Sequence, residues 1–105
     1  ERVEDRLTDD QKLMLFRITQ EALNNVMKHA GATHVWITLC MDDHHLELNI
    51  RDNGRGFKMD HLSEGHFGLE IMRERAEEIG AMLRLNSIPG KGTQLTVTRS
   101  SSIVM

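Results

Sequence analysis

The feature that most constrains the fold is the way the spacing of apolar residues changes along the chain. From about residue 10 to residue 29 they recur three and four positions apart, which predicts an amphipathic helix. Every second residue is then apolar in two stretches within residues 35–52, which predicts an antiparallel hairpin. A helix over about residues 69–79 and two strands within residues 83–97 repeat this order. The sequence therefore predicts an α+β fold, a two-layer α/β sandwich with helices on one face of a mixed, largely antiparallel sheet.

Local signals mark the ends of these elements. Thr8, Asp9 and Asp10 supply the side chains that cap the first helix, and Gly31 ends it. The charged residues 1–9 are interpreted as a lead-in, and residues 100–105 as a C-terminal tail.

Size and charge limit what the chain can be. Its 105 residues predict one domain over residues 1–105. With 13 Lys and Arg against 16 Asp and Glu, the formal net charge of -3 argues against binding to nucleic acid through a basic surface. No apolar run is long enough to span a membrane, so we expect no direct membrane contact, and the lone Cys40 fits a reducing compartment and hence a cytoplasmic location. Because the first residue is Glu1, we interpret the chain as a piece of a longer protein. The single Cys40 excludes an internal disulfide and is expected to be buried or half-buried.

The strongest candidate for a binding residue is Asp52. The alternation of the second strand places it on the same side as the inward-facing Leu48 and Ile50, where a carboxylate must be hydrogen-bonded. Gly54 and Gly56 follow directly and allow close approach of another backbone. Either Asp52 caps the glycine turn, or it accepts a hydrogen bond from a buried ligand amine such as that of adenine.

Polar residues on the first helix form a second candidate group. Glu21, Asn25 and Lys28 lie within a narrow arc beside the apolar stripe, and His29 follows. They form either a solvated face or a site in which an amide oxygen helps to hold Mg²⁺ and a lysine meets a phosphate.

Two further candidates lie at glycines. The segment 65–68 (GHFG) leads into the second helix at Leu69, where free backbone N–H groups either bind an anion or form an ordinary helix start after a flexible loop. Thr93, after Gly92, shares the inner face of the last strand, so its hydroxyl can reach the same interior as Asp52.

These segments resemble the sequence boxes of two-component sensor histidine kinases, in particular the subfamily of nitrate/nitrite and envelope-stress sensors. Residues 19–30 (TQEALNNVMKHA) look like the N box, and residues 52–57 (DNGRGF) look like the first glycine box. Residues 65–76 (GHFGLEIMRERA) resemble the second glycine box, and residues 90–93 (GKGT) the terminal glycine-threonine motif. The resemblance covers most of the chain.

The resemblance implies the Bergerat ATP-binding fold, with ATP and Mg²⁺ as ligands. It implies that Asp52 binds the adenine amine, that Thr93 assists through a water, and that Asn25 holds Mg²⁺ and is a catalytic residue. Glu21 stands where related ATPases place a catalytic carboxylate, whereas many histidine kinases have Asn there. Residues 57–67 would be the ATP lid. The implied nucleotide-binding residues are Asp52, Gly54, Gly56, Lys28, His29, His66, Gly68, Leu69 and Thr93.

The resemblance also implies partners. A kinase of this type phosphorylates a histidine on an upstream helix, in an Arg-rich stretch ending in Leu-His-Asp, and none of the six histidines here stands in that context. The expected acceptor therefore lies on the parent protein's own upstream dimerisation domain, with a response regulator downstream and a parent that is membrane-anchored. The alternatives are a Bergerat-fold ATPase or serine kinase of the anti-sigma type, and a non-catalytic protein-interaction domain.

Overall fold

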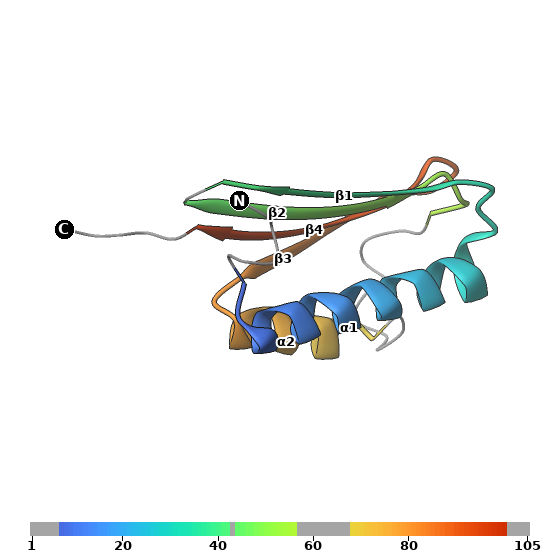
Figure 1. The fold of residues 1–105 in the computed structure, drawn as a ribbon. Coiled ribbons are helices and arrows are strands. Elements are labelled where there is room, and N and C mark those ends of the chain that lie inside the picture. The colour runs from blue at the N-terminus through green and yellow to red at the C-terminus, as the bar shows by residue number, and fades with distance from the viewer. Residues whose placement is uncertain (1–6, 43, 57–67, 101–105) are drawn as a thin grey trace.

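The computed structural model describes residues 7–42, 44–56 and 68–100, and within them the expected order of elements is confirmed. Figure 1 shows the strands as one layer and both long helices on one face of it. The elements are the helix α1 (Asp9–Asn25), the π-helical turn η2 (Val26–Ala30), the hairpin strands β1 (Val35–Met41) and β2 (His45–Asp52), the helix α2 (Leu69–Glu78), and the strands β3 (Met82–Ile88) and β4 (Gly92–Ser100).

The four strands form one sheet in the order β1-β2-β4-β3. Each neighbouring pair is antiparallel, so the described strands contain no parallel pair. The central pair places the last residue of β2, Asp52, opposite Thr93 near the start of β4. This register decides which side chains meet at that end of the sheet.

The first helix begins at a capping box and ends in a wider turn. The Thr8 hydroxyl accepts the Gln11 backbone N–H at 3.1 Å, and the Gln11 side chain accepts the Thr8 N–H at 2.9 Å. The predicted continuous helix to residue 29 is α-helical only to Asn25, after which η2 completes it. Gly31 then has φ 60°, the left-handed conformation that ends helices.

The core lies between the sheet and the two helices. Ile18 from α1, Met72 from α2 and Val97 from β4 are its most completely buried large side chains. Each such burial stabilises the fold by roughly 1.5–3 kcal/mol. Among the residues described, no helix has the length and apolarity needed to cross a lipid bilayer.

The edge strand β1 is the least covered part of the sheet. Val35 and Met41 pack partly on the core, as the alternation predicts, but Ile37 and Leu39 between them are exposed. Cys40 is exposed as well, so the expectation of a buried or half-buried thiol is wrong. The apolar residues around Cys40 in the sequence are typical of a core strand. However, β1 has only one partner strand and lies at the edge of the sheet (Figure 1).

The hairpin joining β1 to β2 is held by one carboxylate. Asp42 Oδ1 accepts the backbone N–H groups of His44 and His45, both at 2.8 Å. The hydrogen bond from His44 is the largest cause that lowers the pKa of Asp42.

Candidate functional site

The end of β2 buries a carboxylate, as the alternation predicts. Asp52 is only 5% exposed, and its Oδ1 accepts the Gly54 backbone N–H at 2.7 Å. The other carboxylate oxygen takes no hydrogen bond from a described residue. Among the described residues no fully buried side-chain oxygen or nitrogen lacks a partner, so this second oxygen is not completely buried. It can therefore accept a hydrogen bond from a ligand.

Two hydroxyl groups follow Asp52 across the sheet, one on the neighbouring strand β4 and one on β3 beyond it. Thr93 is opposite Asp52 in the register, and its Oγ1 is 2.8 Å from the hydroxyl of Ser87. Ser87 is buried on β3 and also donates to the Gly92 carbonyl at 3.2 Å. Ser87 was not predicted as a site residue, although it continues the same alternation as Leu83 and Leu85. Its position fixes the Thr93 hydroxyl next to the buried carboxylate.

Two glycines allow the loop after β2 to pack on the turn between β3 and β4. Gly56 has φ 64°, and a Cβ there would overlap the Ile88 carbonyl oxygen. Gly92 has φ 106°, and a Cβ there would overlap the Asp52 carbonyl oxygen. The close backbone approach expected at Gly56 is therefore made by the chain itself. This close packing at Gly56 and Gly92 fixes the backbone on both sides of the Asp52–Thr93 pair.

The helical layer brings Glu21 to the start of α2. Glu21 is half-buried, and its Oε2 is 3.0 Å from where a Cβ on Gly68 would lie. Gly68 has φ 62° and precedes α2 without a side-chain cap, so the first N–H groups of this helix have no partner within it. The Leu69 side chain is in the core. Only its backbone is therefore suited to the predicted ligand contact.

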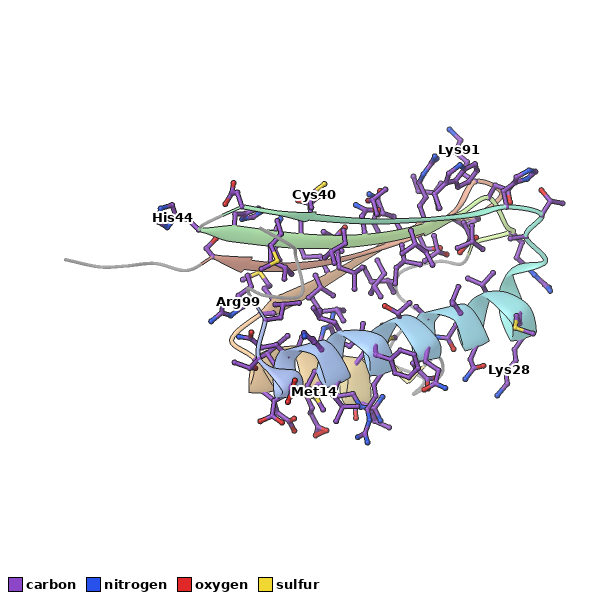
Figure 2. The ribbon with its side chains drawn as sticks, viewed as in Figure 1. Met14, Lys28, Cys40, His44, Lys91 and Arg99 are labelled. Atoms are coloured by element: carbon purple, nitrogen blue, oxygen red, sulfur yellow. The ribbon has the colours of Figure 1, made fainter. Side chains whose placement is uncertain are left out.

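The remaining predicted residues lie either near the end of the first helical segment or outside the described residues. Asn25 is half-buried as the last residue of α1. Lys28 is exposed in η2, and Figure 2 shows its side chain directed away from the sheet, so the structure does not bring it to Asp52. The His29 side chain, His66 and the predicted lid over residues 57–67 lie outside the described residues.

The groups at the end of the sheet and at the end of the first helix share one end of the molecule. Figure 1 shows the C-terminal end of α1, the end of β2 and the β3–β4 turn at the same end. The described residues contain no cluster of three or more His, Cys, Asp or Glu side chains suited to a metal. Mg²⁺ bound through few protein oxygens, substrate phosphates and waters does not require such a cluster.

Comparison with known proteins gives a family match. Residues 10–101 match the family described as histidine kinase-, DNA gyrase B-, and HSP90-like ATPases. The sensor histidine kinase LiaS of Bacillus subtilis is 48% identical over 83 residues, which are 79% of this chain and 23% of LiaS. The sensor protein VraS of Staphylococcus aureus is also 48% identical over 83 residues, 24% of its length. The chain thus spans about a quarter of the length of these relatives.

Solved structures agree with the architecture. The histidine kinase domain of the blue-light activated kinase EL346 from Erythrobacter litoralis has a TM-score of 0.70 at 25% identity, covering 85% of this chain and 44% of that one. The ATP binding domain of PrrB from Mycobacterium tuberculosis has a TM-score of 0.71 at 26% identity, covering 84% of this chain and 67% of that one.

Proposed function

Because the chain belongs to the histidine kinase-, DNA gyrase B-, and HSP90-like ATPase family, we propose that it binds ATP with Mg²⁺ and donates the γ-phosphoryl group to a histidine on a separate dimerisation domain. The names of LiaS and VraS as sensors support the kinase branch of this family. The observation that carries the proposal is the buried Asp52 carboxylate, one oxygen of which accepts no hydrogen bond from a described residue.

The proposed adenine site is built around this carboxylate. The Gly54 N–H already occupies Oδ1, so the exocyclic amine of adenine would donate to the other oxygen. Thr93, held by Ser87, offers a hydroxyl for a water shared with the base. Gly56 and Gly92 support the site by fixing the backbone around it. The residues present thus fit a purine amine, which needs an acceptor in a mostly apolar pocket.

The proposed phosphate site lies at the helical layer. The first N–H groups of α2, which have no partner within the helix, suit an anion. Asn25 would supply an oxygen to Mg²⁺, which neutralises phosphate charge when it is bound. Lys28 and His29 remain predicted phosphate or ribose contacts, and His66 remains a predicted nucleotide-binding residue. The lid over residues 57–67 remains a prediction as well.

In the proposed reaction an imidazole nitrogen of the acceptor histidine attacks the γ-phosphorus, and ADP leaves. This chain would position the triphosphate, while the attacking group comes from the dimerisation domain of the parent protein. We propose that the parent is a membrane-anchored sensor with this domain in the cytoplasm. A response regulator would then receive the phosphoryl group from the histidine.

One observation favours ATP hydrolysis as a second candidate activity. Glu21 places a carboxylate beside Gly68 at the start of α2, where a carboxylate could orient an attacking water. Phosphate release by the chain alone, lost in Glu21→Gln but retained in Glu70→Gln, would support hydrolysis. Glu70 is the matched control, because it is an exposed carboxylate in the first turn of α2.

Thermal unfolding with a non-hydrolysable ATP analogue and Mg²⁺ tests the proposed binding. At ligand about tenfold above its Kd, binding stabilises the folded state by about 1.4 kcal/mol. For a domain of this size we expect the Tm to rise by about 6–11 °C. Asp52→Asn should remove most of the rise, because its amide still accepts the Gly54 N–H but can present a donor toward the adenine amine.

Glu47→Gln is the matched control, since it removes a carboxylate from the outward side of the same strand. It should keep the full rise in Tm. The proposal fails if the wild-type chain shows no nucleotide-dependent rise, or if Asp52→Asn and Glu47→Gln respond alike.

A further inference from the structure

The first helix carries a second apolar stripe on its outer side. The inner side buries Leu15, Ile18 and Ala22. The second stripe, called here the outer stripe, consists of Leu13, Phe16, Gln20, Leu23 and Met27. Leu13 is 42% exposed, Phe16 62% and Met27 83%. A helix that packs on a single core needs only one such stripe, so the outer stripe has no use within the described fold.

The direction of the outer stripe follows from helical geometry. At about 100° per residue, its mean direction lies roughly 150° from that of the buried residues. Figure 1 shows the sheet on one side of α1, so the outer stripe faces away from the sheet. Within α1 it is about 15 Å long from Leu13 to Leu23 at 1.5 Å per residue, and Met27 follows in η2.

The spacing of the outer stripe indicates what shape of partner fits it. Its members follow one another at intervals of three, four, three and four residues. This is the spacing of the seam between two helices in a coiled coil. Gln20 stands at one seam position, where a polar residue fixes the register of the partner. A helix is therefore the shape that this surface accommodates.

Charge distinguishes between possible helical partners. In a seam of this kind the flanking positions choose the partner. Between Lys12 and Val26 both charged flanking residues are basic, while Asp10, one heptad before Arg17, is acidic. Neither Lys12 nor Arg17 has an ion pair among the described residues. A second copy of this chain would bring like charges together across the seam. The flanking positions are Lys12, Arg17, Thr19, Asn24 and Val26.

We propose that the outer stripe binds an amphipathic helix of a partner whose apolar seam is flanked by Asp or Glu. Phe16 and Leu13 supply most of the apolar contact, and Lys12 and Arg17 select the acidic flanks. This interaction is separate from the proposed nucleotide site, because none of these residues contributes to that site.

Two synthetic helical peptides of about three heptads test the proposal. Both have Leu at the seam positions, and they carry either Glu or Lys at the flanking positions. Fluorescence anisotropy with the wild-type chain at about 0.15 M salt should show the Glu peptide binding at least about tenfold more tightly than the Lys peptide. Phe16→Ser should weaken the Glu peptide by about tenfold or more. Lys12→Glu combined with Arg17→Glu should reverse the preference.

Ile71→Ser is the matched control, because Ile71 is an exposed apolar residue on the other helix, α2, and is not part of the outer stripe. It should leave the affinity for the Glu peptide unchanged, and every variant should keep the wild-type Tm within a few degrees. Equal affinity for the two peptides, or no binding of the Glu peptide, overturns the proposal. Sedimentation showing that the chain dimerises through Phe16 would also overturn it in favour of a second copy.

Discussion

The buried carboxylate of Asp52 is the side chain of this site whose burial costs the most free energy unless it is hydrogen-bonded. Burying a carboxylate costs several kcal/mol unless its oxygens are hydrogen-bonded. The structure gives one hydrogen bond to Oδ1, and no described residue donates a hydrogen bond to the other oxygen. The fold thus retains a group that a bound amine would complete, and this is the pattern expected of a binding residue.

Gly90 and Gly92 lie at the same turn, and alanine substitutions there distinguish the cost of steric overlap from the cost of backbone strain. Both have positive φ, but a Cβ on Gly92 would overlap the Asp52 carbonyl, whereas one on Gly90 has no atom within 4 Å. Gly90→Ala should cost about 1–2 kcal/mol from strain alone. Gly92→Ala should cost about 1–3 kcal/mol more because of the overlap. Urea unfolding measures both, and equal losses would contradict the described packing.

Single residues also show how far the sequence could predict the site. Asp52 and Thr93 were placed correctly on inner faces, because the period of two in a strand leaves no choice of side. Ser87 was missed although the same period includes it. Cys40 was misplaced, because the alternation within one strand does not encode which strand becomes the edge of the sheet.

The elements themselves follow closely from local sequence signals. Thr8 and Gly31 mark the limits of the first helical segment as predicted, since capping depends on side chains within a few residues. The change to a π-helical turn after Asn25 was not predicted, because no residue there breaks an α-helix. The order of the strands in the sheet depends on pairing between residues far apart in the sequence. Only the two hairpins have a local sequence signal.

The cap of α1 gives a prediction at this scale. Thr8→Ala removes the hydroxyl that accepts the Gln11 N–H and should lower the free energy of unfolding by about 1 kcal/mol. Thr8→Ser keeps a hydroxyl and should stay within a few tenths of a kcal/mol. Urea unfolding followed by circular dichroism distinguishes the two. A loss of the same size in Thr8→Ser would show that the cap is not the cause.

For the whole molecule, the main consequence of the proposed function is a division of labour between this chain, which would bind ATP, and a dimerisation domain, which would carry the acceptor histidine. The chain matches only 23% of LiaS and 24% of VraS, and its histidines do not stand in the expected acceptor sequence. With ATP labelled at the γ-phosphate, the chain alone should retain no acid-labile label. It should transfer label to an added dimerisation domain that carries its acceptor histidine. Stable label on a histidine of this chain would contradict the division.

The most direct test of the central claim is the preference for ATP over GTP, measured by calorimetry with Mg²⁺. GTP has a carbonyl oxygen where ATP has the amine, and this oxygen would face the second carboxylate oxygen of Asp52. An unmatched buried polar group costs about 1–3 kcal/mol, so ATP should bind at least about fivefold more tightly. Asp52→Asn should reduce this preference to less than about threefold. Equal affinities of the wild-type chain for ATP and GTP, or an unchanged preference in Asp52→Asn, would contradict the assignment of Asp52 to the adenine.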